Sequence, residues 1–272
     1  MTVGLSLTIG ISGVLNFAHG ALYMLAGYIA WQLLNSLGLP YALAAIIAVI
    51  ASGVLGALVY WLVLVRVRGL MLSEIIVTFA LGIGILELLR WSGFTGFRYS
   101  LPTFMEGSIE IADVIVDYQR LFIIGIGVAL VLALWLLAHH SRIGLAFRAI
   151  AQNERTALAY GIESDQVAML SVALGAALAA VAAITILPLG IISIDRGYDV
   201  LIIAFAVAIV GGLESITGMI LASFVLGYAQ VSAAAYLGTH WVMIVNLLAI
   251  ILVLVIKPSG LFGKSKELEE RV

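Results

Sequence analysis

Long apolar segments alternate with short polar ones along almost the whole chain. The recurring segments of 16 to 25 residues are long enough, or nearly so, to cross the roughly 30 Å of bilayer hydrocarbon as helices. The ten-residue alternation that is typical of membrane β-barrels is absent. The pattern therefore predicts a single all-α polytopic membrane domain, residues 1–272, with about eight to ten transmembrane helices. The apolar runs are 1–15, 21–37, 41–65, 70–91, 121–138, 166–187, 200–210, 219–237 and 241–256.

Composition supports a membrane protein and excludes a soluble one. Of the 272 residues, 64% are hydrophobic and only 10% are charged, whereas about 25% are charged in a typical soluble domain. The chain contains no cysteine, which excludes disulfides, thiol catalysis and cysteine-ligated metals.

The polar loop, residues 139–165, separates two runs of membrane length and carries both basic and acidic residues. Gly144 and Gly161 bracket its interior, which has helical periodicity. We expect one or two short amphipathic helices that lie beside the bilayer. The predicted apolar face is Phe147, Ile150, Ala151 and Leu158, and the polar face is Arg148, Gln152 and Arg155.

The basic residues predict the orientation of the chain. Three clusters lie at 66–68, at 142–155 and at 257–271, and even numbers of apolar runs separate them. All three can therefore lie on one side, which is the cytoplasm because cytoplasmic loops are enriched in Lys and Arg. This arrangement predicts a cytoplasmic tail at 257–272 and an acidic external loop at 92–120.

Two glycine-containing segments share the pattern G-x-L-x-x-x-x-G, at 13–20 and at 211–218. Each follows a short apolar run and precedes a longer one. Interrupted helices at corresponding places in two halves of a chain indicate a transport pathway, so we expect two helix breaks in a two-fold internal repeat. Ordinary turns at a membrane surface are the alternative. The candidate pathway residues are Asn16, His19, Gly20, Gly211, Gly212, Glu214 and Gly218.

Three isolated polar features have simpler interpretations. His19, beside Asn16, can carry protons, but it can also satisfy main-chain groups at a helix break. Glu87 and Arg90 are three residues apart and predict a local ion pair. Asn246 predicts a hydrogen bond between helices.

Enzyme motifs are missing. Gly263-Lys264-Ser265 resembles the end of a phosphate-binding loop, but Pro258 stands where that motif requires glycine. No motif for metal-dependent or nucleophilic catalysis occurs. We therefore expect a protein that is not an enzyme and holds no cofactor.

Four segments resemble one family in the same order along the chain. They are Asn16-Phe17-Ala18-His19-Gly20 with Tyr23, Met24, Gly27 and Tyr28; 144–152 with Ala157, Gly161 and Ile162; 211–218; and Lys257-Pro258-Ser259-Gly260-Leu261-Phe262-Gly263. This chain is similar to the branched-chain amino acid permeases of ATP-binding-cassette importers. It departs from the family at Glu214, where a small residue is usual, and in having less apolar sequence before the first motif, from which we expect a shortened first helix.

The resemblance implies a multi-pass subunit of the bacterial or archaeal cytoplasmic (inner) membrane that imports Leu, Ile, Val or related compounds. It implies a second related permease, two cytoplasmic ATPase subunits that bind ATP, an external binding protein, and no nucleic acid. We hypothesise that the acidic loop 92–120 contacts the binding protein; a solvated connector is the alternative. It also places the coupling helix within the polar loop, at 153–161. The candidate ATPase-coupling residues are Arg148, Asn153, Glu154, Arg155, Ala157 and Gly161.

Alternative functions remain open at this point. Related permeases carry polar amino acids, urea or short amides, so the substrate is not fixed by the motifs. A proton-coupled secondary carrier would use His19, Glu87 or Glu214 within the membrane. A membrane scaffold would use the polar loop for partners but would give the two glycine segments no role.

Overall fold

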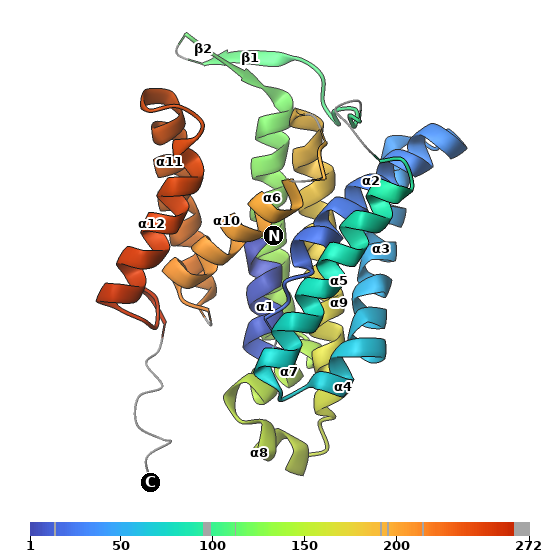
Figure 1. Cartoon of the computed structure of the whole chain (residues 1–272), viewed down its shortest axis with the longest axis vertical. Helices are drawn as coiled ribbons and strands as arrows, with labels where there is room; N and C mark the ends of the chain where they lie inside the picture. Colours follow the sequence, from blue (N-terminus) through green and yellow to red (C-terminus); the bar gives the residue numbers. More distant parts are fainter. Residues whose placement is uncertain are drawn as a thin grey trace.

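The apolar runs of the sequence form helices whose ends lie close to the predicted ones. The computed structural model describes residues 1–13, 15–94, 99–111, 113–190, 192–194, 196–213 and 215–263. The fold is an all-α bundle, as predicted, with one small β-hairpin (Figure 1). The helices are α1 Thr2–Ser12, α2 His19–Leu37, α3 Tyr41–Val59, α4 Val65–Val67, α5 Met71–Trp91, α6 Tyr118–His140, α7 Arg142–Gln152, α8 Glu154–Ala159, α9 Ser164–Ile186, α10 Arg196–Gly211, α11 Ile216–Tyr236 and α12 Trp241–Ile256.

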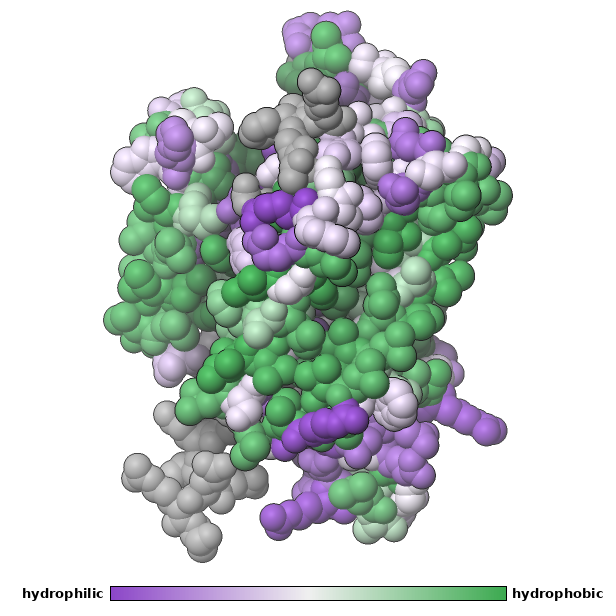
Figure 2. All heavy atoms as spheres, turned by 45° about the vertical axis from the view of Figure 1, so that its right-hand side comes forward, coloured by the Kyte–Doolittle hydropathy of each residue, from purple (hydrophilic) through white to green (hydrophobic). Residues whose placement is uncertain are grey.

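Five helical segments of the described residues are long and apolar enough to cross a membrane. Their outward side chains form a broad apolar band between two polar ends of the molecule (Figure 2). The shorter helices α1 and α12 are also apolar. The chain is thus a multi-pass membrane protein, while the count of eight to ten spans remains a prediction. The five segments are Tyr41–Val67, Leu72–Trp91, Tyr118–His140, Ser164–Leu189 and Thr217–Tyr236.

Helix α9 is the most buried of these spans and forms the centre of the bundle. Its buried face consists largely of Gly, Ala and Ser, which let neighbouring backbones approach closely. A Cβ on Gly4 of α1 would lie only 2.9 Å from the carbonyl oxygen of Gly175 in α9. A Cβ on Gly56 of α3 would lie 2.7 Å from the Cβ of Ala176, the next residue of α9. Small residues therefore set the distances of α1 and α3 from the central helix.

Helices α10, α11 and α12 form a second packed group with its own apolar core. In Figure 1, α11 and α12 stand beside the remaining helices, and α10 leads across to them. Within this group, the side-chain amide of Gln230 donates a 2.7 Å hydrogen bond to Asn246 Oδ1, which joins α11 to α12. The predicted interhelical hydrogen bond of Asn246 is confirmed.

The predicted external loop contains an antiparallel hairpin that the sequence analysis missed. Strands β1 Ser108–Ile111 and β2 Val114–Asp117 pair with Ile109 opposite Val116. Apolar and polar residues alternate in β1, whereas β2 begins with three consecutive apolar residues, Val114–Val116. The sequence interpretation treated 92–120 as an acidic external loop, and each strand of the hairpin has only four residues, too few for a clear periodic signal.

The hairpin and the polar loop lie at opposite ends of the bundle (Figure 1). The first two basic clusters lie at the same end, since Arg68 contacts Glu154 at the start of α8. Glu87 and Arg90 form the predicted ion pair on α5. Arg98, Lys264, Lys266 and Arg271 lie outside the described residues.

Candidate functional site

The polar loop folds into two short helices at one end of the bundle. Ser141 opens α7, because its hydroxyl accepts a 2.9 Å hydrogen bond from the main-chain N–H of Gly144. Phe147 and Ile150 are buried in a cluster that includes side chains of α1 and α9. The charged face of α7, including Arg148, is exposed. The predicted amphipathic character of this segment is confirmed.

Asn153 separates α7 from α8. Its backbone is extended (φ −159°, ψ 102°), and its side-chain oxygen accepts a 3.0 Å hydrogen bond from the N–H of Thr156, which caps α8. The interruption changes which residues of the second helix face inward: Ala157 is buried, whereas Leu158 is exposed. The prediction that Ala151 and Leu158 share the buried face was wrong, because Asn153 breaks the helical periodicity before Leu158, and Ala151 of α7 lines a cavity and is exposed.

The two glycines that bracket the loop have different physical roles. Gly144 lies against the end of α6, where a Cβ would come within 2.6 Å of the Cα of Ala138. Gly161 ends α8 with a φ of +80°, in the left-handed region that glycine adopts without a steric penalty. The first glycine therefore permits a close contact, and the second permits a turn.

The predicted coupling residues differ in their accessibility. Arg148 and Arg155 are exposed, and Ala157 is buried. Glu154 is engaged within the chain, because it pairs with Arg68 and accepts a hydrogen bond from Ser164. Direct ATPase contacts by these residues remain a prediction.

Arg68, in the turn after α4, is the centre of a polar cluster at this end. Its Nη2 lies 2.6 Å from Glu154 Oε1 and 2.5 Å from the hydroxyl of Ser164. Its Nη1 lies 2.5 Å from Asp165 Oδ1, to which the Tyr60 hydroxyl donates a 3.0 Å hydrogen bond. Burial lowers the pKa of the Arg68 guanidinium, but Tyr60 and the two carboxylates together raise this pKa above its ordinary value. We call this group the Arg68 cluster.

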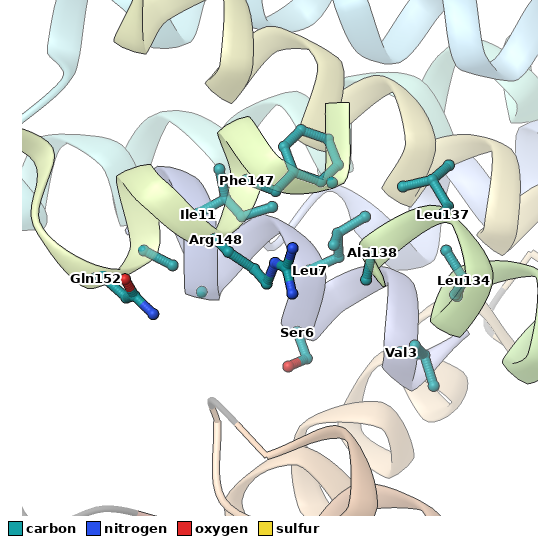
Figure 3. Close-up of a pocket in the computed structure, with 13 residues that line it drawn as sticks. Val3, Ser6, Leu7, Ile11, Leu134, Leu137, Ala138, Phe147, Arg148 and Gln152 are labelled. Carbon is teal, nitrogen blue, oxygen red and sulfur yellow. The ribbon is translucent and has the colours of Figure 1, made fainter. Parts of the chain in front are cut away.

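A cavity of about 290 Å³ lies between α1, α6 and α7 (Figure 3). Its walls are mainly apolar and include Leu7, Leu134 and Phe147. Arg148 and Gln152 border it, and Figure 3 shows the Arg148 side chain extending from α7 toward α1. The cavity thus combines apolar walls with a cationic rim.

A second cavity of about 510 Å³ lies between α1, α6, α9 and α11. It shares Val3 and Leu134 with the first cavity, so the two adjoin along α1 and α6. Apolar side chains dominate here too, and Phe224 contributes from α11. Together the two cavities form what we call the α1–α6 cleft.

The first set of predicted pathway residues lies in packed surroundings and lines neither of these cavities. Asn16 and His19 are both 1% exposed. The side-chain oxygen of Asn16 accepts a 3.0 Å hydrogen bond from the N–H of Ala18. His19 Nε2 lies 3.4 Å from the Met1 carbonyl oxygen. Gly20 packs against Gly197 of α10. A transport role for Asn16, His19 and Gly20 remains a prediction.

The second set meets the terminal motif of the sequence. The N–H of Leu261 donates a 2.9 Å hydrogen bond to the Val210 carbonyl, and that of Phe262 donates a 3.3 Å bond to the Gly211 carbonyl. A Cβ on Gly212 would lie 2.5 Å from the main-chain nitrogen of Gly263. The turn after α12 therefore caps the end of α10.

This packing explains the glycines of the second segment. Gly212 has a φ of +99°, and Gly218 packs against Gly211. Glu214 lies outside the described residues. The interpretation of 13–20 and 211–218 as equivalent breaks of an internal repeat remains a prediction.

Comparison with known proteins decides the family. Residues 1–254 match the family described as branched-chain amino acid transport system / permease component. The chain belongs to this permease family. The high-affinity branched-chain amino acid transport system permease protein BraD of Pseudomonas aeruginosa is 30% identical over 278 residues, which cover 97% of this chain and 91% of that protein.

Relatives of this permease occur in bacteria and archaea. The high-affinity branched-chain amino acid transport system permease protein LivH of Escherichia coli is 30% identical over 280 residues, with 97% and 90% of the two chains covered. The probable branched-chain amino acid transport permease protein LivH of Methanocaldococcus jannaschii is 27% identical, with 97% and 87% covered. No solved structure matched this permease.

The sequence analysis missed the Arg68 cluster of this permease. It assigned Arg68 to a topological signal, and the partners of Arg68 lie 86 to 97 residues away in the sequence. The sequence signal for this cluster was limited to the charged residues near Arg68 and in the polar loop. Among the residues that the structure describes, no three His, Asp or Glu side chains gather as metal ligands would.

Proposed function

We propose that this permease is one membrane subunit of an ATP-driven importer that carries branched-chain amino acids across a bacterial or archaeal cytoplasmic membrane. Two ATPase subunits bind and hydrolyse ATP, a second related permease completes the pathway, and an external binding protein delivers the substrate. The chain itself has no ATPase site and needs no cofactor. The end of the bundle with the polar loop and the tail faces the cytoplasm.

The observation that carries this proposal is the form of the polar loop in a chain of this family. Helices α7 and α8 connect two membrane-length helices and present an exposed surface beyond the apolar band. Tyr160 is 83% exposed and Leu158 is 50% exposed, beside the exposed Arg155. Aromatic, aliphatic and arginine side chains together are typical of a protein–protein contact. An ATPase subunit is the expected occupant of this surface.

The α1–α6 cleft is the candidate substrate route. Its apolar walls suit the side chains of Leu, Ile and Val, and Arg148 can attract the carboxylate of an amino acid at the loop end. Alternating access would open this cleft to one side at a time, driven by the different contacts that the ATPases make with the two states.

The external hairpin is the candidate contact for the binding protein. Val114 and Ile115 are 59% and 72% exposed on β2, and acidic residues flank them in the sequence. Exposed apolar side chains within a polar rim are common in interaction surfaces. Replacing 108–117 by a short glycine linker should abolish stimulation of ATP hydrolysis by the binding protein.

Reconstitution tests the proposed function. The permease would be purified with its partner permease and ATPases, placed in liposomes with the binding protein and given radiolabelled leucine. We expect leucine uptake that requires ATP. The double substitution Arg155→Ala and Leu158→Ala should reduce this uptake while both permeases remain in the membrane. Uptake without ATP, or a complex that forms without ATPases, would contradict the proposal.

Two further measurements separate the alternatives. Competition by valine and isoleucine, and its absence with urea or acetamide, would fix the substrate class. A proton-coupled carrier would lose uptake when an uncoupler collapses the proton gradient, whereas ATP-driven uptake would persist. His19 and Glu87, which such a carrier would use, each have a separate local contact, with Met1 and Arg90 respectively.

A further inference from the structure

One guanidinium joins three segments that are far apart in the sequence. Arg68 follows α4, Glu154 begins α8, and Asp165 lies in the first turn of α9. Both carboxylates lie within 2.6 Å of Arg68 nitrogen atoms. The Arg68 cluster therefore ties the polar loop to two membrane-spanning segments.

The chemistry of the cluster requires arginine. The two Nη atoms point to different acceptors, with Nη1 on Asp165 and Nη2 on Glu154 and Ser164. A planar guanidinium holds such a fork of donors in fixed directions, whereas a lysine ammonium is a single point charge. The Arg68 side chain is 20% exposed, which makes it less accessible to water than either carboxylate.

Packing around Tyr60 extends the cluster into the membrane-spanning helices. Tyr60 begins a π-helical turn, Tyr60–Leu64, between α3 and α4, and π-helical turns are frequent at functional positions. Its ring is buried with Leu64, and with Ala168 and Val172 of α9. The lower end of α3–α4 and the first turns of α9 therefore form one packed body.

Helix α6 is attached to the same loop in a different way. In an 18-residue apolar stretch of α6 no residue is buried inside the described structure, although Gln119 at the start of α6 is buried and donates a 2.9 Å hydrogen bond to the Thr185 carbonyl of α9. The join of α6 to α7 depends on the close approach at Gly144 and on the Ser141 cap. The polar loop is thus held by charge-assisted hydrogen bonds on its α3–α4 and α9 side.

We propose that Arg68 is a positioning residue that makes α8, the α3–α4 end and the start of α9 move as one body. When α8 is displaced, the end of α3 and the start of α9 move with it, and α6 moves relative to all three. The inference rests on the proposed function only in naming an ATPase as the source of that displacement. Glu154 acts within this arrangement through Arg68.

Distances between spin labels test the rigid body directly. The chain has no cysteine, so pairs can be introduced without background labelling. Trp61→Cys with Thr156→Cys reports on the π-helical turn before α4 and on α8, and Trp135→Cys with Thr156→Cys reports on α6 and α8. In nanodiscs we expect the first distance distribution to be narrower than the second in the unsubstituted protein, and Arg68→Gln to broaden the first distribution. An unchanged first distribution would overturn the inference.

Transport coupling tests the consequence. In the reconstituted complex, Arg68→Gln should lower the amount of leucine transported per ATP hydrolysed by about tenfold, the factor that corresponds to the lower end of the contribution of a charge-assisted hydrogen bond. Arg66→Gln is the matched control, since Arg66 is exposed and its Nη1 donates a 3.3 Å hydrogen bond to the Trp61 carbonyl of its own segment. Arg68→Lys keeps the positive charge but lacks the paired donors of the guanidinium, so it should give an intermediate ratio of leucine transported to ATP hydrolysed.

The outcomes are separable. If Arg68→Gln and Arg68→Lys lower assembly of the complex but leave the transport-to-hydrolysis ratio of the assembled fraction unchanged, Arg68 only stabilises the fold and the inference fails. If the unsubstituted protein shows no ATP-dependent uptake, the proposed function fails, while the label distances still decide whether Arg68 makes one rigid body.

Discussion

The hydroxyl of Ser6 in α1 donates a 2.6 Å hydrogen bond to the main-chain carbonyl of Leu213, in the turn between α10 and α11. The two residues are 207 positions apart. This contact joins the bundle around α9 to the group α10–α12, which has an apolar core of its own. It lies at the turn whose conformation depends on Gly212.

Ser6→Ala should loosen the attachment of α10–α12 to α1. Loss of the hydroxyl leaves a carbonyl of the turn without this partner, and we expect a loss of about 1 kcal/mol in unfolding free energy. Thermal unfolding in detergent measures the change. Ser223→Ala is the control, since the exposed Ser223 hydroxyl donates its hydrogen bond to the Ile220 carbonyl of its own helix. Equal effects of the two substitutions would contradict a special role for Ser6.

Gly218→Ala should destabilise the junction of α10, α11 and the turn after α12. A Cβ at this position would lie 2.7 Å from the Cβ of Phe262 and would also collide with the Gly211 carbonyl. Overpacking of this kind costs about 1 to 3 kcal/mol. Gly227→Ala, in the same helix with no neighbour within 4 Å of the added Cβ, should instead stabilise the helix by up to about 1 kcal/mol. Opposite shifts of the unfolding temperature would establish the close contact.

Gln230 and Asn246 should be energetically coupled within the membrane. Asn246 is fully buried, and its Oδ1 accepts the interhelical hydrogen bond from Gln230. A double-mutant cycle with Gln230→Leu and Asn246→Leu should give a coupling energy of about 0.6 to 1.7 kcal/mol. Additive effects in reversible unfolding would show that the two helices associate through packing alone.

Tyr160→Ala should weaken the binding of the ATPase subunit and leave the fold intact. Tyr160 is 83% exposed, so its removal exposes little new apolar surface, and aromatic residues at the centre of an interface commonly contribute more than about 2 kcal/mol to binding. Co-purification and a binding titration with the isolated ATPase measure the change. Tyr236→Ala is a matched control, since Tyr236 is 87% exposed and ends α11. Equal affinities for both variants would exclude the tip of α8 from the contact.

The helices could be predicted from sequence because each depends on local composition and length. Tyr41 and Trp241 begin helices, and Trp91 and Ile256 end them, as the apolar runs predict. The family could likewise be predicted, because its motifs are local and occur in the same order. Hydrocarbon thickness constrains these features strongly, so little information about tertiary contacts is needed.

The details of the candidate site depend on contacts that a single sequence does not contain. A single residue, Asn153, interrupts the helical periodicity of the polar loop and reverses the expected exposure of Leu158. The pairing of Arg68 with Glu154 and Asp165 follows from how α3, α8 and α9 pack. In the sequence, Arg68 lies in a different polar segment from its two carboxylate partners, so Arg68 was interpreted only as an indicator of membrane orientation.

The cap on α10 has a consequence for biosynthesis. The carbonyl groups of Val210 and Gly211 receive their hydrogen bonds from Leu261 and Phe262, which the ribosome adds only after α11 and α12. Until then these carbonyls need water or another donor, because an unsatisfied peptide group is costly in lipid. The end of α10 can therefore receive this cap only after α12, the last described helix, has been synthesised.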